Sequence, residues 1–320
     1  MCIPGRSGCA AFIIILVMGP GLNHSFAQAP NKDSLLAPFR TGGNDGLNGL
    51  LLVPGMESAI ALGKKTFKAE LGLDYVLNDF GDTNGNSRFT MDNSVLEFSA
   101  HLSYGVADFL DIGIHVPYTS TDSIVGIIEG EALFDVTSGS NSTDPGNEMS
   151  DPVLEAKFQV WGGKQPGTGF SLRSKIKIPL ADERDLHSSG GVDVSLGVLY
   201  TEESSYGVLH LNLDYIAYGS HNSFRPQANV DLTDTVLVGA AYMFEVKENQ
   251  LSVGAQAYTY LNPYRDTNGN LDGLDGPPLG IMIGTRWFPW KNFGIEFSAG
   301  PGLTSDSGSF YAFLNLSYQL

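Results

Sequence analysis

The stretch Phe67-Lys68-Ala69-Glu70-Leu71-Gly72-Leu73-Asp74-Tyr75 decides the fold of this chain. Its odd-numbered positions are apolar, whereas its even-numbered positions are charged or glycine. Successive side chains of a β-strand point to opposite faces, so this stretch predicts a strand with one apolar and one polar face.

The same alternation returns along the rest of the chain. The further segments lie near residues 95–104, 109–118, 153–161, 170–178, 191–201, 206–217, 235–246, 250–261, 278–288, 292–301 and 310–320. A tilted strand of about ten residues has the length needed to cross a bilayer. Short connections alternate with long ones, and the long ones cover 78–93, 119–150, 181–190, 218–234, 262–277 and 302–309.

This layout predicts an all-β fold, an antiparallel transmembrane β-barrel in the outer membrane of a Gram-negative bacterium. We expect about 12 strands, with short turns toward the periplasm and long loops outside. The count stays open between about 10 and 14, since outer-membrane barrels vary in strand number and residues 229–235 also read as a short strand and turn.

A soluble β-sandwich is the alternative, because its strands alternate too. The clustered charge on the polar face weighs against it, and so does the chain's end on an alternating segment that finishes at Leu320. That segment looks like the C-terminal strand read by the barrel assembly machinery. Aromatic residues at strand ends fit interfacial girdles, and they are Tyr75, Tyr104, Tyr118, Trp161, Tyr200, Tyr215, Trp287, Trp290 and Tyr318.

Composition excludes two broad classes of protein. The chain has 320 residues and a formal net charge of −17, which argues against a nucleic-acid partner because such proteins need a basic face. Its apolar content of 42% argues against intrinsic disorder.

The first 27 residues predict a secretory signal peptide. Arg6 supplies the positive charge, the apolar core of residues 9–18 is too short for a transmembrane helix, and Ser25-Phe26-Ala27 fits a cleavage site. An uncleaved anchor is the alternative. Cys2 and Cys9 are the only cysteines, so the mature chain would contain none.

We therefore expect three parts: a signal peptide at 1–27, an N-terminal periplasmic or luminal segment at 28–63, and the barrel at 64–320. The apolar run Leu50-Leu51-Leu52-Val53 makes full disorder of the second part unfavourable. That segment could partly plug the lumen, add a periplasmic edge, or remain a disordered leader.

Several stretches resemble outer-membrane barrel families of Gram-negative bacteria without an assigned function, one a domain-of-unknown-function family and one named for a meta-pathway of phenol degradation. The matching stretches are Asn48–Gly63, Tyr104–Tyr118, Asp151–Lys157, Lys175–Leu180 and Ser189–Gly197. One departure is Ala181-Asp182, where these families more often carry Thr-Gly. The resemblance implies a transporter-like or porin-like barrel without a defined substrate.

If the apolar stripes face lipid, the charged residues face the lumen. The lumen-lining set is then Lys68, Glu70, Asp74, Glu97, His101, Asp111, His115, Glu155, Lys157, Arg173, Lys175, Lys177, Asp193, His210, Asp214, Arg286 and Glu296. One interpretation is a salt-bridged network that fills a narrow barrel. The other is a basic stripe, Arg173, Lys175 and Lys177, that guides anions through a pore.

Two loops repeat the pentapeptide Asp-Thr-Asn-Gly-Asn. Its carboxylate and amide oxygens could form a weak Ca²⁺ or lipopolysaccharide-bridging site, from Asp82, Asn84, Asn86, Asp266, Asn268, Asn270 and Asp272. Polar turns are the alternative, because Asn-Gly and Asp favour turns. We expect no other cofactor.

The function that this pattern favours is a porin-like channel or small-solute transporter, in contact with outer-membrane lipid and lipopolysaccharide. The alternative is a structural or adhesion barrel that works through long loops such as 119–150. A lipid hydrolase is a third hypothesis, but no nucleophile elbow or zinc motif appears, so we expect no enzyme. His115 and Asp111 could hydrogen-bond across the lumen, with His101 on the adjacent strand, in a structural network rather than a catalytic pair.

Overall fold

The computed structural model describes residues 32–40, 52, 54–84, 87–121, 125–128, 131–135, 148–162, 167–181, 188, 190–219, 230–261, 264–266, 277–304 and 309–320. Residues 1–31, with the expected signal peptide, lie outside this part. Among the described residues, no helix is long and apolar enough to cross a membrane.

One short helix, α1, spans Lys32–Leu35. The strands in chain order are β1 (Phe67–Asn84), β2 (Ser87–Ala107), β3 (Leu110–Thr121), β4 (Val125–Ile128), β5 (Glu131–Asp135), β6 (Glu148–Met149), β7 (Val153–Gly162), β8 (Gly169–Lys177), β9 (Asp193–Glu203), β10 (Val208–Ala217), β11 (Val230–Leu232), β12 (Thr235–Lys247), β13 (Leu251–Tyr260), β14 (Tyr264–Asp266), β15 (Leu279–Trp290), β16 (Phe293–Pro301) and β17 (Phe310–Gln319).

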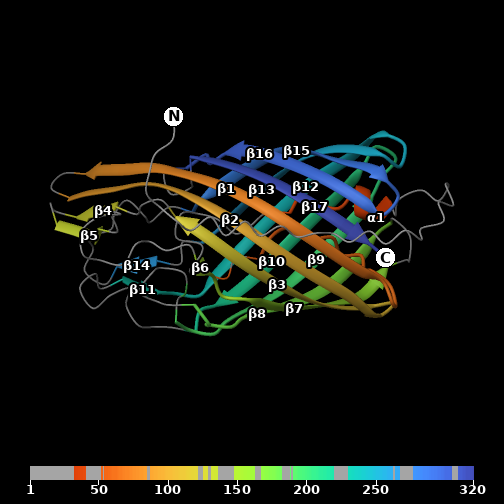
Figure 1. Cartoon of the computed structure of the whole chain (residues 1–320), viewed down its shortest axis with the longest axis horizontal. Coiled ribbons are helices and arrows are strands. Elements are labelled where there is room, and N and C mark those ends of the chain that lie inside the picture. Colours follow the sequence, from red (N-terminus) through yellow and green to blue (C-terminus); the bar gives the residue numbers. More distant parts are fainter. Residues whose placement is uncertain are drawn as a thin grey trace, which may run out of the picture.

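Twelve of these strands close into one antiparallel barrel (Figure 1). Around the wall the order is β1, β2, β3, β7, β8, β9, β10, β12, β13, β15, β16 and β17, and β17 pairs again with β1. Closure leaves the barrel no unpaired sheet edge. The predicted fold class is therefore confirmed, with the strand count that the sequence favoured.

The two ends of the barrel differ in their connections. One end, called here the short-turn end, carries the tight connections such as Lys247 to Leu251 and also the C-terminus (Figure 1). The opposite, long-loop end carries β4, β5, β11 and β14. These four short strands pair among themselves, β4 with β5 and β11 with β14, outside the barrel. Strand β11 lies in residues 229–235, which left the number of barrel strands open in the sequence. It pairs only with β14, so it adds no strand to the barrel, and the number of barrel strands stays even.

One expected loop is wrong. Residues 78–93 were expected to form a long loop, but β1 and β2 continue through them as a hairpin. Their pairing runs without a register shift from Phe67 opposite Tyr104 to Asn84 opposite Ser87. No proline lies between residues 78 and 93 to remove a ladder hydrogen bond, so nothing in the sequence stops the pairing at the membrane boundary.

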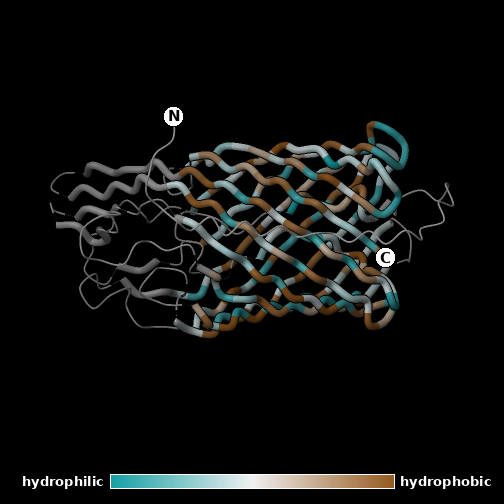
Figure 2. The backbone as a smooth tube through the Cα atoms, viewed as in Figure 1, coloured by the Kyte–Doolittle hydropathy of each residue, from teal (hydrophilic) through white to brown (hydrophobic). Residues whose placement is uncertain are grey.

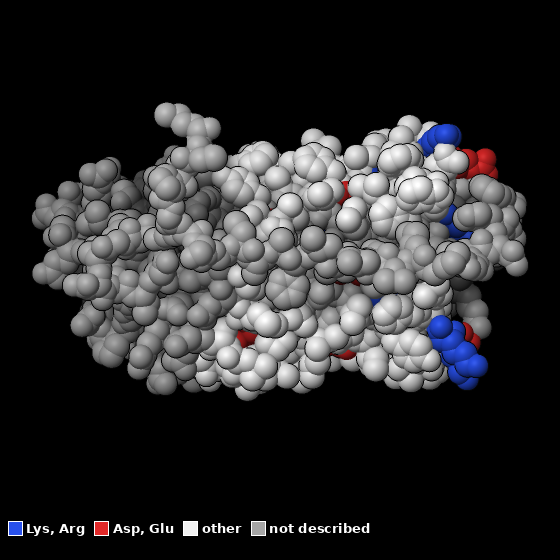
Figure 3. Space-filling model, in the orientation of Figure 1, with Lys and Arg blue, Asp and Glu red and all other residues white. Residues whose placement is uncertain are grey.

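The outer wall of the barrel is apolar and its inner wall is largely polar. On β10, Leu211 and Leu213 are 42% and 49% exposed, whereas His210 and Asp214 are 1% and 0% exposed. Figure 2 shows apolar residues along the whole barrel, and Figure 3 shows few charged atoms on its wall, with Lys and Arg gathered at the short-turn rim. A soluble sandwich would bury its apolar face, so this wall faces lipid.

Large aromatic side chains mark both ends of this apolar belt. Trp161 and Trp290 are 59% and 67% exposed at the short-turn end, and Tyr118 and Tyr215 are 41% and 48% exposed nearer the long loops. Such positions suit the two membrane interfaces, where an aromatic ring meets both lipid and water.

The lumen also holds an apolar cluster. Toward the long-loop end, the wall strands contribute the buried side chains Val76, Val95, Tyr258, Met282, Tyr311 and Phe313. The rings of Tyr258 and Tyr311 meet edge to face with centroids 6.3 Å apart. This packing fills one side of the barrel and leaves the polar side chains of β1, β2, β3, β7 and β8 around the remaining space.

Candidate functional site

The N-terminal segment passes through the lumen in two described stretches. These stretches, residues 32–40 and residues 52 and 54–62, are called here the luminal segment. Leu35, Leu36 and Phe39 are buried against the inward side chains of three barrel strands, in a cluster completed by Val208, Met243 and Phe288. Within the described residues, the segment therefore lies inside the barrel rather than along a periplasmic edge.

Arg286 of β15 holds the first stretch at the end of α1. Its Nη1 donates to the carbonyl oxygens of Ser34 and Ala37 at 2.7 Å each, and its Nη2 donates to that of Pro38 at 2.9 Å. The last carbonyls of a helix, here that of Ser34, have no partner within the helix. One guanidinium thus satisfies this carbonyl and two that follow the helix. Its charge is balanced by Glu296 of β16.

The second stretch is bound through its backbone. Leu52 donates its N–H to Asp193 at 3.2 Å, Ala59 donates to Thr201 at 2.9 Å, and Leu62 donates to Asp111 at 2.9 Å. Asp193 begins β9 at the long-loop end, whereas Thr201 and Asp111 lie toward the short-turn end. The chain thus descends the lumen without adding a strand, because wall side chains satisfy its backbone.

Glu57 of the luminal segment lies between two wall cations. One carboxylate oxygen is 2.9 Å from Lys157 Nζ on β7, and the other is 3.2 Å from Arg173 Nη1 on β8. Burial acts to raise the pKa of Glu57, but Lys157 and the neighbouring cations outweigh it and lower the pKa to about 2. Glu57 is therefore a fixed negative charge that ties the segment to the wall.

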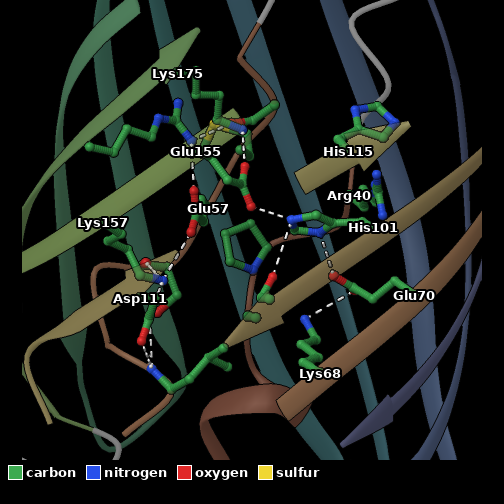
Figure 4. A pocket seen from close by; sticks show the side chains of 18 of the residues that line it. Arg40, Glu57, Lys68, Glu70, His101, Asp111, His115, Glu155, Lys157 and Lys175 are labelled. Carbon is green, nitrogen blue, oxygen red and sulfur yellow. Dashed lines mark hydrogen bonds and ion pairs between the residues drawn. The ribbon is translucent and has the colours of Figure 1, made fainter. Parts of the chain in front are cut away.

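A second chain of charges crosses β1, β2, β7 and β8 (Figure 4). Lys68 Nζ lies 3.0 Å from Glu70, Glu70 lies 3.1 Å from His101 Nδ1, His101 Nε2 bonds Glu155, and Glu155 lies 3.1 Å from Lys175. Because positive and negative groups alternate, each carboxylate is shared by two basic side chains.

Two ion pairs join strands that are not neighbours, and each passes over a glycine. Arg173 of β8 binds Asp214 of β10 across Gly197 of β9, where a Cβ atom would lie 2.0 Å from Asp214 Oδ1. His101 and Glu155 meet across Gly113 of β3, where a Cβ atom would lie 2.6 Å from Glu155 Oε1. The missing side chain leaves the space through which the charged groups reach one another.

The remaining residues proposed for the lumen are buried or half-buried in the wall. Lys177 lies 2.7 Å from Asp193 and 3.6 Å from Asp151, so every cation of the basic stripe has an acidic partner. His210 is bonded to Thr201 and to the carbonyl of Leu36. Asp74 and Glu97 are 3% and 6% exposed.

The expected hydrogen bond between His115 and Asp111 is wrong. The two residues lie four positions apart on β3, which separates them by about 13 Å along the strand. Asp111 instead accepts the N–H of Leu62 and lies 3.6 Å from Lys157. His115 Nε2 is directed toward Glu97 at 3.9 Å. The described histidines His101, His115 and His210 are half-buried or buried, none on the lipid-exposed surface.

Sequence reasoning missed Arg40 and Glu57, two charged residues of the luminal segment that line the cavity. The signal was that each of these charges stands alone next to a mainly small and apolar run, residues 35–39 for Arg40 and residues 53–56 for Glu57. The loop residues proposed for Ca²⁺ are not described: Asn86, Asn268, Asn270 and Asp272 lie outside the described residues, as do the side chains of Asp82, Asn84 and Asp266. Within the described part of the chain, no group of three or more His, Cys, Asp or Glu side chains could hold a metal ion.

Between the luminal segment and the wall lies a cavity of about 190 Å³. Strands β1, β2, β3, β7 and β8 supply Lys68, Glu70, His101, Asp111, His115, Glu155, Lys157, Arg173 and Lys175 to its lining, and β15 supplies Arg286. The segment supplies Arg40 and Glu57 together with apolar side chains. The cavity has room for a small polar or amphipathic solute.

Comparison with known proteins gives a family and a fold. A family model described as "Putative MetA-pathway of phenol degradation" matches residues 77–320. No curated protein sequence matches the chain. The crystal structure of an outer membrane channel from Pseudomonas putida F1 has a TM-score of 0.60 at 14% identity, covering 84% of this chain and 100% of that one.

Two other solved structures are similar at lower scores. The monoaromatic hydrocarbon channel CymD has a TM-score of 0.43 at 9% identity, covering 80% of this chain and 88% of that one. The toluene transporter TodX of P. putida has a TM-score of 0.39 at 11% identity, covering 80% and 89%. The barrel, its apolar belt and the likeness to the first structure make this chain an outer-membrane β-barrel, the predicted location.

Proposed function

Since the chain belongs to the family of the MetA pathway of phenol degradation, as its sequence resemblance predicted, we propose that it is a passive outer-membrane channel for small solutes. The observation that carries the proposal is the cavity of about 190 Å³ inside a lipid-facing barrel, next to a luminal segment held by side chains. The family description points to small aromatic compounds as its solutes.

The luminal segment acts as the gate in this proposal. Its contacts with the wall are separate hydrogen bonds and ion pairs, such as Ala59 to Thr201 and Glu57 to Lys157, rather than a continuous strand ladder. A neutral hydrogen bond of this kind can be exchanged for water at a net cost of about 0.5–1.5 kcal/mol, and one to a charged group at about 1.5–3 kcal/mol. Partial release of the segment would widen the path past the cavity without opening the barrel wall.

Conductance across planar bilayers tests this function. We expect the mature protein to give small, fluctuating single-channel currents, and a variant lacking residues 32–62 to give larger, steadier ones. Heat-dependent migration in gel electrophoresis verifies that the shortened barrel is folded. A folded wild type without current, together with a folded deletion variant without current, would reject the channel.

We also propose that the chain is divided as the sequence predicts, into a signal peptide at 1–27, an N-terminal segment at 28–63 and the barrel at 64–320. Cleavage after Ala27 would leave Gln28 only four residues before α1, and the segment could then enter the lumen from the periplasm. N-terminal sequencing of the protein from outer membranes tests the site. A start within residues 1–20 would contradict it.

Assembly is proposed to use the last strand. Strand β17 pairs with β1 and closes the barrel, and its outward residues include Leu314 and Tyr318, both 38% exposed. We infer that the barrel assembly machinery reads this strand and that lipopolysaccharide contacts the outer rim. Removal of residues 318–320 should reduce the amount of folded protein in outer membranes, and unchanged assembly would contradict the first inference. Equal stability in vesicles with and without lipopolysaccharide would contradict the second.

A further inference from the structure

The cavity beside the luminal segment has an apolar part and a charged part. The segment contributes the apolar Pro38, Met56 and Ile60 together with Arg40 and Glu57, and the strands opposite contribute mostly lysine, arginine, histidine and carboxylate groups. A cavity of about 150 Å³ is enough to hold benzene, and this cavity is about 190 Å³. It therefore has room for a single substituted ring.

Most charged side chains around the cavity have a partner of opposite charge, but one has none among the described residues. Each lining carboxylate is already in contact with a basic side chain, as with Glu70 beside Lys68 and Glu155 beside Lys175. Five of the six lining Lys and Arg residues form ion pairs, and these are Lys68, Lys157, Arg173, Lys175 and Arg286. The sixth, Arg40, forms none with any described residue.

Arg40 is fixed in place through its backbone, and one nitrogen of its guanidinium is unsatisfied. Its backbone N–H donates to Glu296 at 2.7 Å, while its Nη1 is buried and has no hydrogen-bond partner among the described residues. Figure 4 draws Arg40 next to His101 and His115 with no dashed line to it, and His115 Nε2 is likewise buried without a hydrogen bond. Asp74 also has an unpartnered oxygen, but it does not line the cavity.

We propose that this cavity binds a small amphipathic anion of the size of a single-ring aromatic carboxylate, with its charge at Arg40 and its ring against the apolar side chains of the luminal segment. The inference rests on the proposed channel function and names the class of its solute. A guanidinium presents two parallel N–H donors that match the two oxygens of a carboxylate. A neutral ring would leave the buried Nη1 of Arg40 without a hydrogen bond, so the charged solute is preferred.

Calorimetric titration of the folded mature protein in detergent at pH 7 tests the ligand class. Benzoate is the probe, benzyl alcohol is its neutral counterpart, and inorganic phosphate is an anion without an apolar part. We expect benzoate to bind roughly tenfold or more tightly than either, since one charge-assisted contact separates it from the alcohol. Equal affinity for benzoate and benzyl alcohol would overturn the assignment of charge to the site, and equal affinity for phosphate would overturn the apolar face.

Arg40→Gln is the matching variant. It keeps the backbone N–H that binds Glu296 and removes only the guanidinium, so benzoate affinity should fall roughly tenfold or more. Lys247→Gln removes a charge from an exposed turn and should leave benzoate affinity unchanged. Unchanged binding in a folded Arg40→Gln barrel would place the anion elsewhere and overturn the proposal.

Conductance of the same preparations separates the two proposals. Channels that conduct but do not bind benzoate would overturn the ligand class and leave the channel function standing. A protein that binds benzoate through Arg40 but gives no current would retain the site and reject the channel.

Discussion

Arg173 of β8 and Asp214 of β10 form their ion pair across an intervening strand, directly over Gly197 of β9. Arg173 Nε lies 2.9 Å from Asp214 Oδ1, and both residues stand opposite Gly197 in the ladder. Arg173 also donates to the carbonyl of Gly55 at 2.8 Å. One glycine in the wall thus sets the position of a guanidinium that holds the luminal segment.

Gly197→Ala should therefore disturb both the wall and the segment. The added methyl group would meet Asp214 at 2.0 Å and the stem of Arg173 at 3.2 Å. We expect a loss of about 1–3 kcal/mol in the free energy of unfolding, the usual cost of overpacking a filled interior. Urea unfolding followed by tryptophan fluorescence measures it.

Gly239→Ala is the control for this substitution. The atoms nearest its added methyl group all belong to the side chain of Met56, which can rotate away. A Gly239→Ala barrel that loses as much stability as Gly197→Ala would show that the Arg173–Asp214 pair is not the sensitive element.

Glu57→Gln should loosen the luminal segment. It removes the charge that Lys157 and Arg173 share, at a cost of about 1–2 kcal/mol, between the values typical of exposed and buried pairs. We expect more frequent openings in single-channel recordings. Glu248→Gln, in an exposed turn, should leave the recordings unchanged. Identical gating of Glu57→Gln and wild type would count against an ionic anchor at this residue.

The pH dependence of this anchor follows from the lowered pKa of Glu57. A depressed pKa in the folded state stabilises the protein above the ordinary value of 4.5, and that contribution is lost as the pH falls toward about 2. The stability difference between wild type and Glu57→Gln should stay constant from pH 8 to about pH 5 and shrink below it. Acid unfolding of the two proteins side by side measures the difference, and a difference that vanished near pH 7 would be inconsistent with the paired geometry.

Arg286→Gln should destabilise the barrel strongly. It removes three hydrogen bonds to carbonyls in and just after α1 and leaves Glu296 buried without its basic partner, for which about 3–5 kcal/mol is typical. The double variant Arg286→Gln/Glu296→Gln should recover part of the loss, because no buried charge is left unpaired. If the double variant were less stable than the single one by the full cost of Glu296→Gln alone, the two residues would not be coupled.

The lipid-facing wall predicts a depth-dependent cost for charge. Leu213 is 49% exposed midway along β10, so Leu213→Arg should cost about 2–4 kcal/mol in vesicles. Tyr206 is 85% exposed in the turn before β10, so Tyr206→Arg should cost about 0–1 kcal/mol. Equal costs at the two positions would contradict the placement of the membrane.

Strand positions and their inward faces could be predicted from the sequence because the period of two assigns each side chain to a face. The contacts between side chains of different strands could not be predicted. Contacts such as His101 with Glu155 depend on the ladder register of three strands and on the space above Gly113. The alternation of apolar and polar residues within each strand does not say which residues of neighbouring strands stand opposite one another.

The interior apolar cluster escaped prediction for a related reason. Phe313 and Tyr311 share the inward face of β17 with Asn315, and the assumption that apolar residues face lipid fails where a narrow barrel is filled by its own side chains. The course of the luminal segment escaped prediction because its backbone partners, such as Thr201 and Asp111, are side chains far along the chain.

A reversible lock on the luminal segment tests the gating claim most directly. The oxygens of Ser58 and Thr201 lie 3.5 Å apart, so Ser58→Cys/Thr201→Cys should form a disulfide between the segment and β9. The only native cysteines, Cys2 and Cys9, lie in the expected signal peptide. In one planar bilayer, the oxidised double variant should stay at its lowest conductance, and reduction should restore the wild-type fluctuations. Equal currents before and after reduction, with the disulfide verified by mass spectrometry, would contradict a gate formed by the luminal segment.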